Sequence, residues 1–361
     1  MSNAPDYRTK TTIPVIDIRD GGPVRLAREG ASLARDLRDE CVAYLPRGVA
    51  LLVPALDAIG RRWLSRSCSP YVPEIAQIAL ALGFPGVWFL NNAYNWGCTA
   101  LAREEGGVPW LVRTLDWPFP GLGRRVEVAR MRGAAGEFFS ATWPGYAGVL
   151  TAMAPGRFAG SVNQAPLWRR TRHPWLRPYD ICANAFRTWT LRFMPPDQLL
   201  RLAFETCASF AEARHLLETE PVARPVIYTL AGCRPGERCI IERTEQHFTI
   251  HEQETCAAND WLVPRPNWEA RITSKHLFTR TAQEAAQRSR ARADTLIDYT
   301  GSLAHDGFGW VVTPLLNPFT RIAATMCPAR GVMRVSGYEV VVPGALPEPV
   351  TRTCEVAAAA A

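Results

Sequence analysis

The sequence predicts an α+β fold in which groups of helices and groups of strands pack as layers. Apolar residues recur at helical spacing before about Cys98, and short strand-like segments separated by turns follow it. The two kinds of element do not alternate as βαβ units, which disfavours a doubly wound parallel sheet. Of 361 residues, 47% are apolar, enough to bury a sizeable core. Because no internal repeat or long linker divides the chain, we expect one compact unit.

The N-terminal part is predicted to be helical. Apolar residues keep a helical period over residues 24–60, which Pro54 interrupts. The period returns over residues 73–82 and ends at Gly83. Residues 87–90 then form a short apolar run, which predicts a buried strand.

Two β-hairpins are predicted further along the chain. In the first, residues 98–103 and 108–115 flank a turn, residues 104–107, that ends in two glycines. In the second, residues 226–230 and 238–242 flank a Pro-Gly turn.

Four further segments complete the predicted elements. Residues 199–206 place apolar side chains on one helical face, and Ser209 with Glu212 predicts a capping box at the start of a second helix. Residues 282–296 predict a polar helix rich in arginine and alanine. Residues 168–178 mix arginine with tryptophan and proline, which predicts a loop or lid insertion.

Composition argues against several classes of function. The net charge is +7, but the basic residues are scattered, so we expect no nucleic-acid binding. No apolar run is long enough for a membrane span, and the first twenty residues lack the apolar core of a secretory signal. We therefore expect a cytoplasmic protein. The ten cysteines contain no C-x-x-C pair, so we expect neither a disulfide scaffold nor a metal site, and no other cofactor.

The first hairpin brings a thiol and an arginine together. If its turn is centred on residues 105–106, Cys98 lies directly opposite Arg113. Opposed residues share a face of the sheet, and a guanidinium beside a thiol stabilises the thiolate. Asp116 has the wrong parity for that face unless the strand bends at its end, which would bring the carboxylate to the backbone nitrogen of Cys98. Spacing alone favours a plainer interpretation, a buried strand thiol and a surface ion pair.

An ordered set of motifs favours the functional interpretation of Cys98 and Arg113 over the plainer one. It comprises Gly97-Cys98-Thr99-Ala100, Arg113-Thr114-Leu115-Asp116-Trp117, residues 145–151, Ala258-Asn259-Asp260-Trp261 and Arg271. The set resembles the N-terminal nucleophile (Ntn) cysteine hydrolases of the acid ceramidase and N-acylethanolamine acid amidase group, which is related to choloylglycine hydrolase and penicillin V acylase. That group's pattern is Cys-Thr-Ser followed by Arg-Asn-x-Asp. Here Ala100 replaces the serine and Thr114 replaces the asparagine.

The resemblance implies a four-layer αββα sandwich, two antiparallel sheets flanked by helices. It also implies autoproteolysis between Gly97 and Cys98. The cut would leave an N-terminal helical segment, residues 1–97, released or retained, and a catalytic segment, residues 98–361. The freed α-amine of Cys98 would accept the proton of its own thiol, a task suited to an amine with a pKa of about 7.7–8.0.

The resemblance also implies a role for each further catalytic residue. Asp116 would hold the α-ammonium group, and Arg113 would position the thiol. Asn259 would donate a hydrogen bond to the oxyanion, and Arg271 would order the region around Asn259.

Three residues are candidates for substrate binding. Asn163 comes from the group's Asn-Glu-Arg motif, which reads Asn163-Gln164-Ala165 here and so predicts a changed pocket. Trp143 and Tyr146 are aromatic candidates for the wall of an apolar pocket.

The predicted activity is hydrolysis of a linear carbon–nitrogen amide bond in a small N-acyl amide, through a thioester on Cys98. Two alternatives stay open. An acyltransferase would pass the same acyl group to an amine, and a catalytically silent binding protein would keep only the fold. The sequence does not fix the oligomeric state, so a homo-oligomer also stays open.

Overall fold

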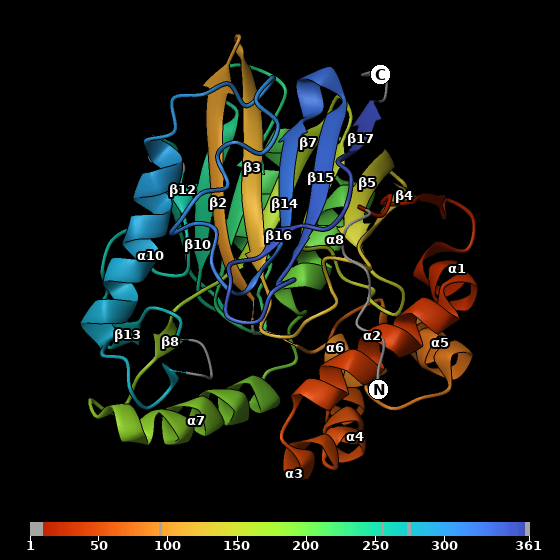
Figure 1. Ribbon diagram of the computed structural model, residues 1–361, viewed down its shortest axis with the longest axis vertical. Coiled ribbons are helices and arrows are strands. Elements are labelled where there is room, and N and C mark those ends of the chain that lie inside the picture. Colours follow the sequence, from red (N-terminus) through yellow and green to blue (C-terminus); the bar gives the residue numbers. More distant parts are fainter. Residues whose placement is uncertain (1–9, 94–95, 254–255, 273–275, 358–361) are drawn as a thin grey trace.

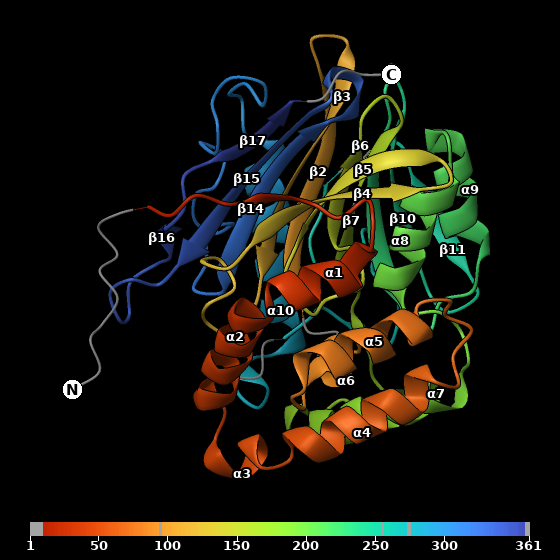
Figure 2. The same cartoon turned by 90° about the vertical axis from the view of Figure 1, so that its right-hand side faces the viewer.

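Two stacked β-sheets form the centre of the molecule, with helices over their outer faces and a further helical region at one end (Figures 1 and 2). The computed structural model describes residues 10–93, 96–253, 256–272 and 276–357. No helix in these ranges is long and apolar enough to cross a membrane.

The first sheet has eight strands in the order β1-β4-β5-β6-β7-β9-β10-β11. Its pairings are antiparallel except for the parallel pair of β1 and β4. The strands are β1 (Val15–Asp17), β4 (Glu127–Gly133), β5 (Gly136–Thr142), β6 (Thr151–Ala154), β7 (Phe158–Gln164), β9 (Val226–Ala231), β10 (Arg238–Arg243) and β11 (Phe248–His251).

The second sheet has seven strands, all paired antiparallel, in the order β12-β2-β3-β14-β15-β16, with β17 also on β15. A separate two-stranded ribbon joins β8 to β13. These strands are β12 (Cys256–Ala257), β2 (Gly97–Glu105), β3 (Val108–Asp116), β14 (Thr320–Cys327), β15 (Val332–Glu339), β16 (Glu348–Pro349), β17 (Cys354–Ala357), β8 (Leu167–Trp168) and β13 (Trp268–Glu269).

The helices complete four layers. Helices α8 (Pro196–Thr206) and α9 (Phe210–Thr219) pack on the first sheet, and α10 (Ala282–Ile297) packs on the second. Strands β2 and β3 contact β7 and β9 of the other sheet, so the main apolar core lies between the two sheets. The order is helix, sheet, sheet, helix, which confirms the predicted αββα sandwich.

The remaining helices gather below one end of the sandwich (Figure 2). Six of them precede the first hairpin, and α7 comes from the middle of the chain. They are α1 (Gly22–Glu29), α2 (Ala31–Tyr44), α3 (Arg47–Ala50), α4 (Val53–Leu64), α5 (Val72–Leu82), α6 (Val87–Leu90) and α7 (Arg177–Thr190), which the 3-10 turn η1 (Pro174–Leu176) precedes. A second 3-10 turn, η3 (Pro328–Arg330), joins β14 to β15.

Two local predictions are wrong. The run Val87–Leu90 is helix α6 rather than a strand, because Gly86 opens a helical turn at φ 116° and the Asn91 side chain donates to the carbonyl of Val87. So short an apolar run cannot separate the two states by period. The stretch 168–178 is not a plain loop, since it holds the end of β8, turn η1 and the start of α7, where Pro178 occupies the first turn.

The register of the first hairpin also differs from the prediction. Glu105 pairs with Val108, so the turn contains only Gly106 and Gly107, both at positive φ. This two-residue turn shifts the pairing by two positions and places Cys98 opposite Leu115 rather than Arg113. A shift of two preserves the face on which each side chain lies, so the two predicted partners still share one face.

The other predicted hairpin and helices are confirmed. Strands β9 and β10 pair as expected, and α5, α8 and α10 occupy the predicted ranges. At the start of α9, the backbone N–H of Glu212 donates to the Ser209 hydroxyl at 3.2 Å, which is half of the capping box. The Glu212 carboxylate accepts from Ala208 instead of from Ser209 itself.

Candidate active site

Cys98 lies near the start of β2, and its side chain is fully buried between the two sheets. Burial raises the pKa of the thiol, and the neighbouring Arg113 acts in the opposite direction. The Nη2 of Arg113 lies 2.7 Å from the sulfur, as a hydrogen bond. The structure therefore brings the predicted thiol and guanidinium into direct contact despite the shifted register.

Arg113 is held in place from the opposite sheet. Its Nη1 donates to the carbonyl of Leu150 at 2.6 Å and to the hydroxyl of Thr151 at 2.5 Å. Its Nη2 also reaches the carbonyl of Val162 at 3.4 Å. Because these partners fix the planar guanidinium from both ends, the Cys98 sulfur faces a cation that cannot swing away.

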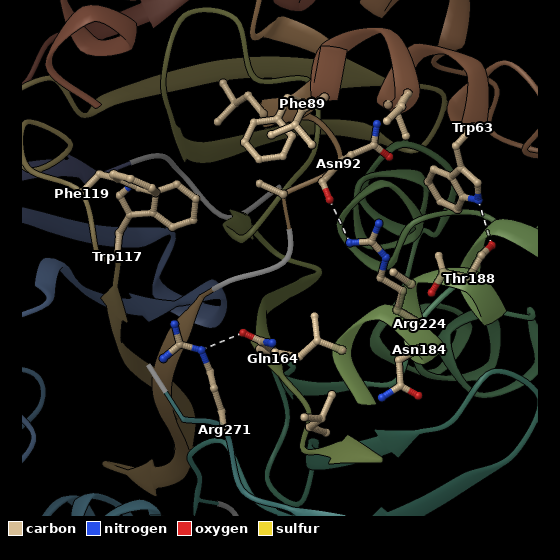
Figure 3. A pocket seen from close by; sticks show the side chains of 18 of the residues that line it. Trp63, Phe89, Asn92, Trp117, Phe119, Gln164, Asn184, Thr188, Arg224 and Arg271 are labelled. Atoms are coloured by element: carbon tan, nitrogen blue, oxygen red, sulfur yellow. Dashed lines mark hydrogen bonds between the residues drawn. The ribbon is translucent and has the colours of Figure 1, made fainter. Parts of the chain in front are cut away.

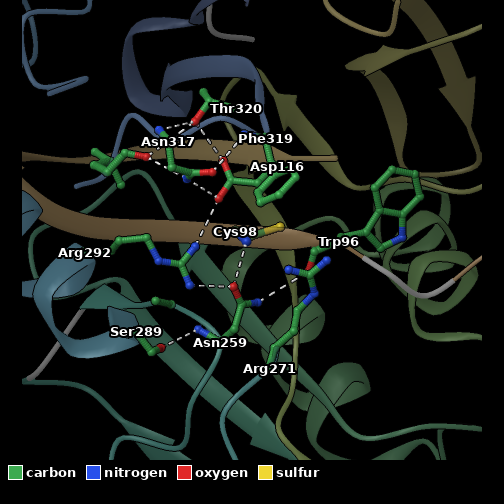
Figure 4. A network of polar contacts seen from close by, with 12 residues as sticks. Trp96, Cys98, Asp116, Asn259, Arg271, Ser289, Arg292, Asn317, Phe319 and Thr320 are labelled. Carbon is green, nitrogen blue, oxygen red and sulfur yellow. Dashed lines mark hydrogen bonds and ion pairs between the residues drawn. The ribbon is translucent and has the colours of Figure 1, made fainter. Parts of the chain in front are cut away.

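Asp116 ends β3 and pairs directly with Gly97. Its buried carboxylate accepts hydrogen bonds from the Asn317 amide at 2.8 Å, the Thr320 hydroxyl at 3.0 Å and Arg292 at 3.0 Å (Figure 4). The backbone N–H of Cys98 donates to Asn259 rather than to this carboxylate. Asp116 therefore lies beside Gly97, the residue that precedes Cys98.

Asn259 occupies the position beside the Cys98 nitrogen. The backbone N–H of Cys98 donates to its Oδ1 at 2.9 Å, and Arg292 Nη2 donates to the same oxygen at 2.9 Å. The Nδ2 of Asn259 donates to the carbonyl of Gln164 at 2.8 Å. Its backbone N–H donates to the Ser289 hydroxyl of α10 at 2.9 Å, so α10 anchors both the main chain and the side chain.

Arg271 lies next to this amide. Its backbone N–H donates to the carbonyl of Asn259 at 3.0 Å, and its Nε donates to the Gln164 side chain at 2.7 Å. Burial, with the nearby charge of Arg292, lowers the pKa of Arg271 to about 10. The predicted catalytic residues thus form one cluster around the Gly97–Cys98 bond.

A cavity of about 1110 Å³ adjoins this cluster and extends between the N-terminal helices and α7 (Figure 3). Arg271 and Gln164 belong to its wall, whereas Cys98 does not. Most of the wall is apolar, with contributions from Leu37, Leu56, Trp63, Trp117, Ile181 and Trp189. Such a wall with a few polar groups at one place is typical of a site for a small apolar ligand.

The three predicted substrate-binding residues do not line this cavity. Asn163 is buried in β7 and donates to the carbonyls of Ala257 and Ala258, which supports the chain just before Asn259. Trp143 donates to the carbonyl of Leu122, and the Tyr146 hydroxyl donates to Asp197 at 2.7 Å. Both aromatics pack into the core, where the Tyr146 ring contacts those of Trp96 and Trp143.

Several residues of the cluster are absent from the sequence prediction. They are Gln164, Ser289, Arg292, Asn317 and Thr320. A polar helix facing solvent gives no signal that two of its side chains point inward, and the turn before β14 carries no motif. Among the described residues there is no group of three or more side chains that could hold a metal ion.

The curated proteins that the chain resembles are amidases and ceramidases. No protein-family model matches the chain. The chain is 28% identical over 181 residues to an N-acylethanolamine-hydrolyzing acid amidase of Oryctolagus cuniculus, covering 48% of each chain. It is 25% identical over 222 residues to a probable acid ceramidase of Caenorhabditis elegans, covering 56% of this chain and 54% of that one. Over about half of its length, the chain is similar to N-acylethanolamine acid amidases and acid ceramidases. This relationship confirms the resemblance stated above.

The extent of the likeness is limited. The chain spans about half the length of the curated amidase and ceramidase relatives it matches. Among solved structures, an N-acylethanolamine-hydrolyzing acid amidase orthologue of Caenorhabditis elegans aligns at TM-score 0.47 and 17% identity, covering 64% of this chain and 93% of that one. A conjugated bile acid hydrolase of Clostridium perfringens aligns at TM-score 0.39 and 8% identity, covering 72% and 92%.

Proposed function

We propose that the protein is an Ntn cysteine amidase that cuts itself between Gly97 and Cys98 and then hydrolyses an N-acyl amide with a large apolar acyl group. The contact of the Cys98 sulfur with the buried Arg113 guanidinium, at 2.7 Å, carries this proposal. A structural thiol in a strand needs no such partner. Homology to acid amidases and acid ceramidases supports the same reaction class.

Self-cleavage would begin with attack of the Cys98 sulfur on the carbonyl carbon of Gly97. The Gly97–Cys98 amide bond breaks as a thioester forms, and the thiol proton passes to the nitrogen that becomes the α-amine. Water then hydrolyses the thioester, which leaves a carboxylate on Gly97 and restores the Cys98 thiol. In the uncut chain this nitrogen is an amide and cannot serve as a base, so amidase activity requires the cut.

In the mature enzyme the α-amine of Cys98 takes the thiol proton while the sulfur attacks the substrate carbonyl. Arg113 stabilises the developing thiolate. In the uncut chain Asn259 Nδ2 donates to the carbonyl of Gln164 at 2.8 Å and to that of Trp96 at 3.5 Å. In the proposed mature enzyme the hydrogen released from Trp96 would serve the oxyanion. One such donor contributes roughly 2.7–4 kcal/mol. The α-ammonium returns its proton to the leaving amine, and water resolves the acyl thioester to the free acid.

The cavity supports an apolar acyl group as the part of the substrate that is recognised. Its wall combines side chains from before the cut, such as Leu37 and Trp63, with side chains from after it, such as Ile181 and Trp189. The segment 1–97 therefore stays bound to the segment 98–361 in the proposed mature enzyme. If it dissociated, about half of the acyl site would be lost.

The test is intact mass and N-terminal sequencing of the purified protein, followed by assay against N-acyl amides of increasing acyl length. We expect two associated fragments that begin at the native N-terminus and at Cys98, with hydrolysis favouring long acyl chains. Cys98→Ala should stay at 40.0 kDa and hydrolyse nothing. The matched control is Cys256→Ala, another buried strand thiol, which should cut and hydrolyse like the parent.

Three outcomes would contradict the proposal. Release of the 98–361 fragment from Cys98→Ala would show that another nucleophile makes the cut. A stable uncut chain without amide hydrolysis would favour the silent binding protein. An added amine that captures the acyl group in place of water would identify an acyltransferase instead.

A further inference from the structure

We propose that Arg292 is a positioning residue of this site, which fixes the orientation of the Asn259 amide and keeps the freed Cys98 amine in its neutral, proton-accepting form. This inference rests on the proposed function and deepens it. Arg292 belongs to none of the motifs that carry the resemblance, and it lies on α10, outside the first hairpin.

The contacts of Arg292 join two parts of the site. Its side chain is 14% exposed and enters the cluster from α10. Nη1 donates to Asp116 Oδ2 at 3.0 Å, and Nη2 donates to Asn259 Oδ1 at 2.9 Å (Figure 4). A planar guanidinium can donate in two fixed directions at once, whereas a lysine ammonium on a flexible stem cannot hold both partners in one geometry.

These contacts determine which end of the Asn259 amide faces the Cys98 nitrogen. The backbone N–H of Cys98 and Nη2 of Arg292 are both donors, so the atom they share must be the oxygen. A flipped amide would bring its own NH₂ group against two donors. Arg292 therefore keeps Nδ2 turned toward Gln164 on the cavity wall, where the substrate carbonyl would arrive.

The same guanidinium acts on the charge of the nucleophilic residue. Because it shares an acceptor oxygen with the Cys98 nitrogen, it lies within about two hydrogen-bond lengths of the future amine. A cation at that range disfavours the ammonium form. The described charged groups that act on Cys98 are Arg113 and Asp116 from β3, Arg271 after β13, and Arg292. By engaging Asp116, Arg292 also weakens the attraction of that carboxylate for an ammonium group.

The experiment compares Arg292→Gln and Arg292→Lys in the full chain, with Arg288→Gln as the matched control. Arg288 is an exposed arginine one turn earlier on the same helix. Self-cleavage is followed by intact mass, folding by circular dichroism, and kcat/KM is measured against pH. The low-pH limb of that profile reports the base of the free enzyme. We expect Arg292→Gln to move this limb upward by about one pH unit, since removal of a nearby cation favours the ammonium.

Arg292→Lys restores the charge without the two-way hydrogen bonding. We expect it to keep the low-pH limb near that of the parent while kcat falls, and we expect Arg288→Gln to change neither quantity. A merely structural arginine would lower activity at every pH without moving the limb.

The outcomes separate the inference from the proposed function. If the parent protein neither cuts itself nor hydrolyses amides, the proposed function fails. If the parent does both and Arg292→Gln shows an unchanged pH profile, the role of Arg292 is refuted and the function stands. If Arg292→Gln fails to fold or to cut, Arg292→Met, which also removes the charge but keeps an unbranched side chain, takes its place. A low-pH limb raised above that of the parent supports the role, and a limb at the parent's position or an uncut chain overturns it.

Discussion

A buried ion-pair network ties α7 to the strand that precedes Arg271, and its central carboxylate offers a sharp test of the structure. Glu269 is 4% exposed and accepts from Arg177 through Nε at 3.1 Å and Nη2 at 2.6 Å. It also accepts from Arg169, which binds Asp180 at 2.6 Å on its other side. We predict that Glu269→Gln strongly destabilises the protein, because the buried Arg177 would lose its carboxylate partner and Arg169 would keep only Asp180.

The size of the effect follows from burial. Removal of one partner from a buried ion pair typically costs about 3–5 kcal/mol, since the remaining charge stays desolvated. With an unfolding entropy of about 2.1 cal/mol/K per residue, a chain of 361 residues has about 0.8 kcal/mol/K. The expected drop in melting temperature is therefore about 4–7 °C.

The assay is a thermal melt followed by circular dichroism, with Glu137→Gln as the matched control. Like Glu269, Glu137 pairs with more than one arginine, but it lies at the surface with 29% of its side chain exposed. Its partners are Arg19, Arg130 and Arg132. Solvent screening limits such pairs to about 1 kcal/mol. If the melting temperature falls by the same amount in both variants, burial does not govern the strength of the Glu269 network and the reasoning is wrong.

Two further predictions concern the scissile bond and a buried acid. An ideal Cβ on Gly97 would lie 2.9 Å from Asp116 Cβ and 3.0 Å from Arg271 Nη1, so Gly97→Ala should slow self-cleavage about tenfold to a hundredfold. The matched control is Gly48→Ala, whose new methyl group enters open space, so this variant should cut itself at the parent's rate when followed by intact mass. Equal rates of self-cleavage in the two variants would contradict the argument from crowding at Gly97. Burial raises the pKa of Glu127 to about 7 from 4.5, so the protein should lose about 3 kcal/mol as pH rises through that interval. Glu127→Gln should recover this loss of unfolding free energy at pH 8 and should be no more stable than the parent at pH 4, as urea unfolding at the two pH values would show. An equal gain in stability at both pH values would contradict the raised pKa as its cause.

The layered fold could be predicted because period and turn chemistry fix the element types along most of the chain. The strand register of the first hairpin was harder to predict from the sequence. Counting the turn as residues 104–107 misplaces the pairing, since both Gly106 and Gly107 take positive φ and form the whole turn. The contact of Cys98 with Arg113 survived that error because side-chain faces repeat every two residues.

The site could be predicted only in part, for a related reason. Cys98, Arg113 and Asp116 lie on one hairpin, where spacing constrains them, and the resemblance supplied Asn259 and Arg271. The side chains of Ser289 and Arg292 come from a helix whose composition is that of a solvated surface. Nothing local indicates that this helix turns one polar face onto the sheet, because that orientation is decided by packing against β2 and β12.

In the uncut structure the Cys98 thiol is held in an unreactive state until the proposed cut. Cys98 is fully buried, burial raises the pKa of its thiol, and its nitrogen is tied as an amide to the oxygen of Asn259. Cleavage at Gly97 would change that one nitrogen from a neutral donor into a base without dismantling the cluster, since Arg113 and Asn259 also have partners away from the scissile bond. The helices before the cut also remain necessary, because they form one side of the cavity. In the proposed enzyme, activation is thus a change of chemistry at one atom rather than the removal of a segment.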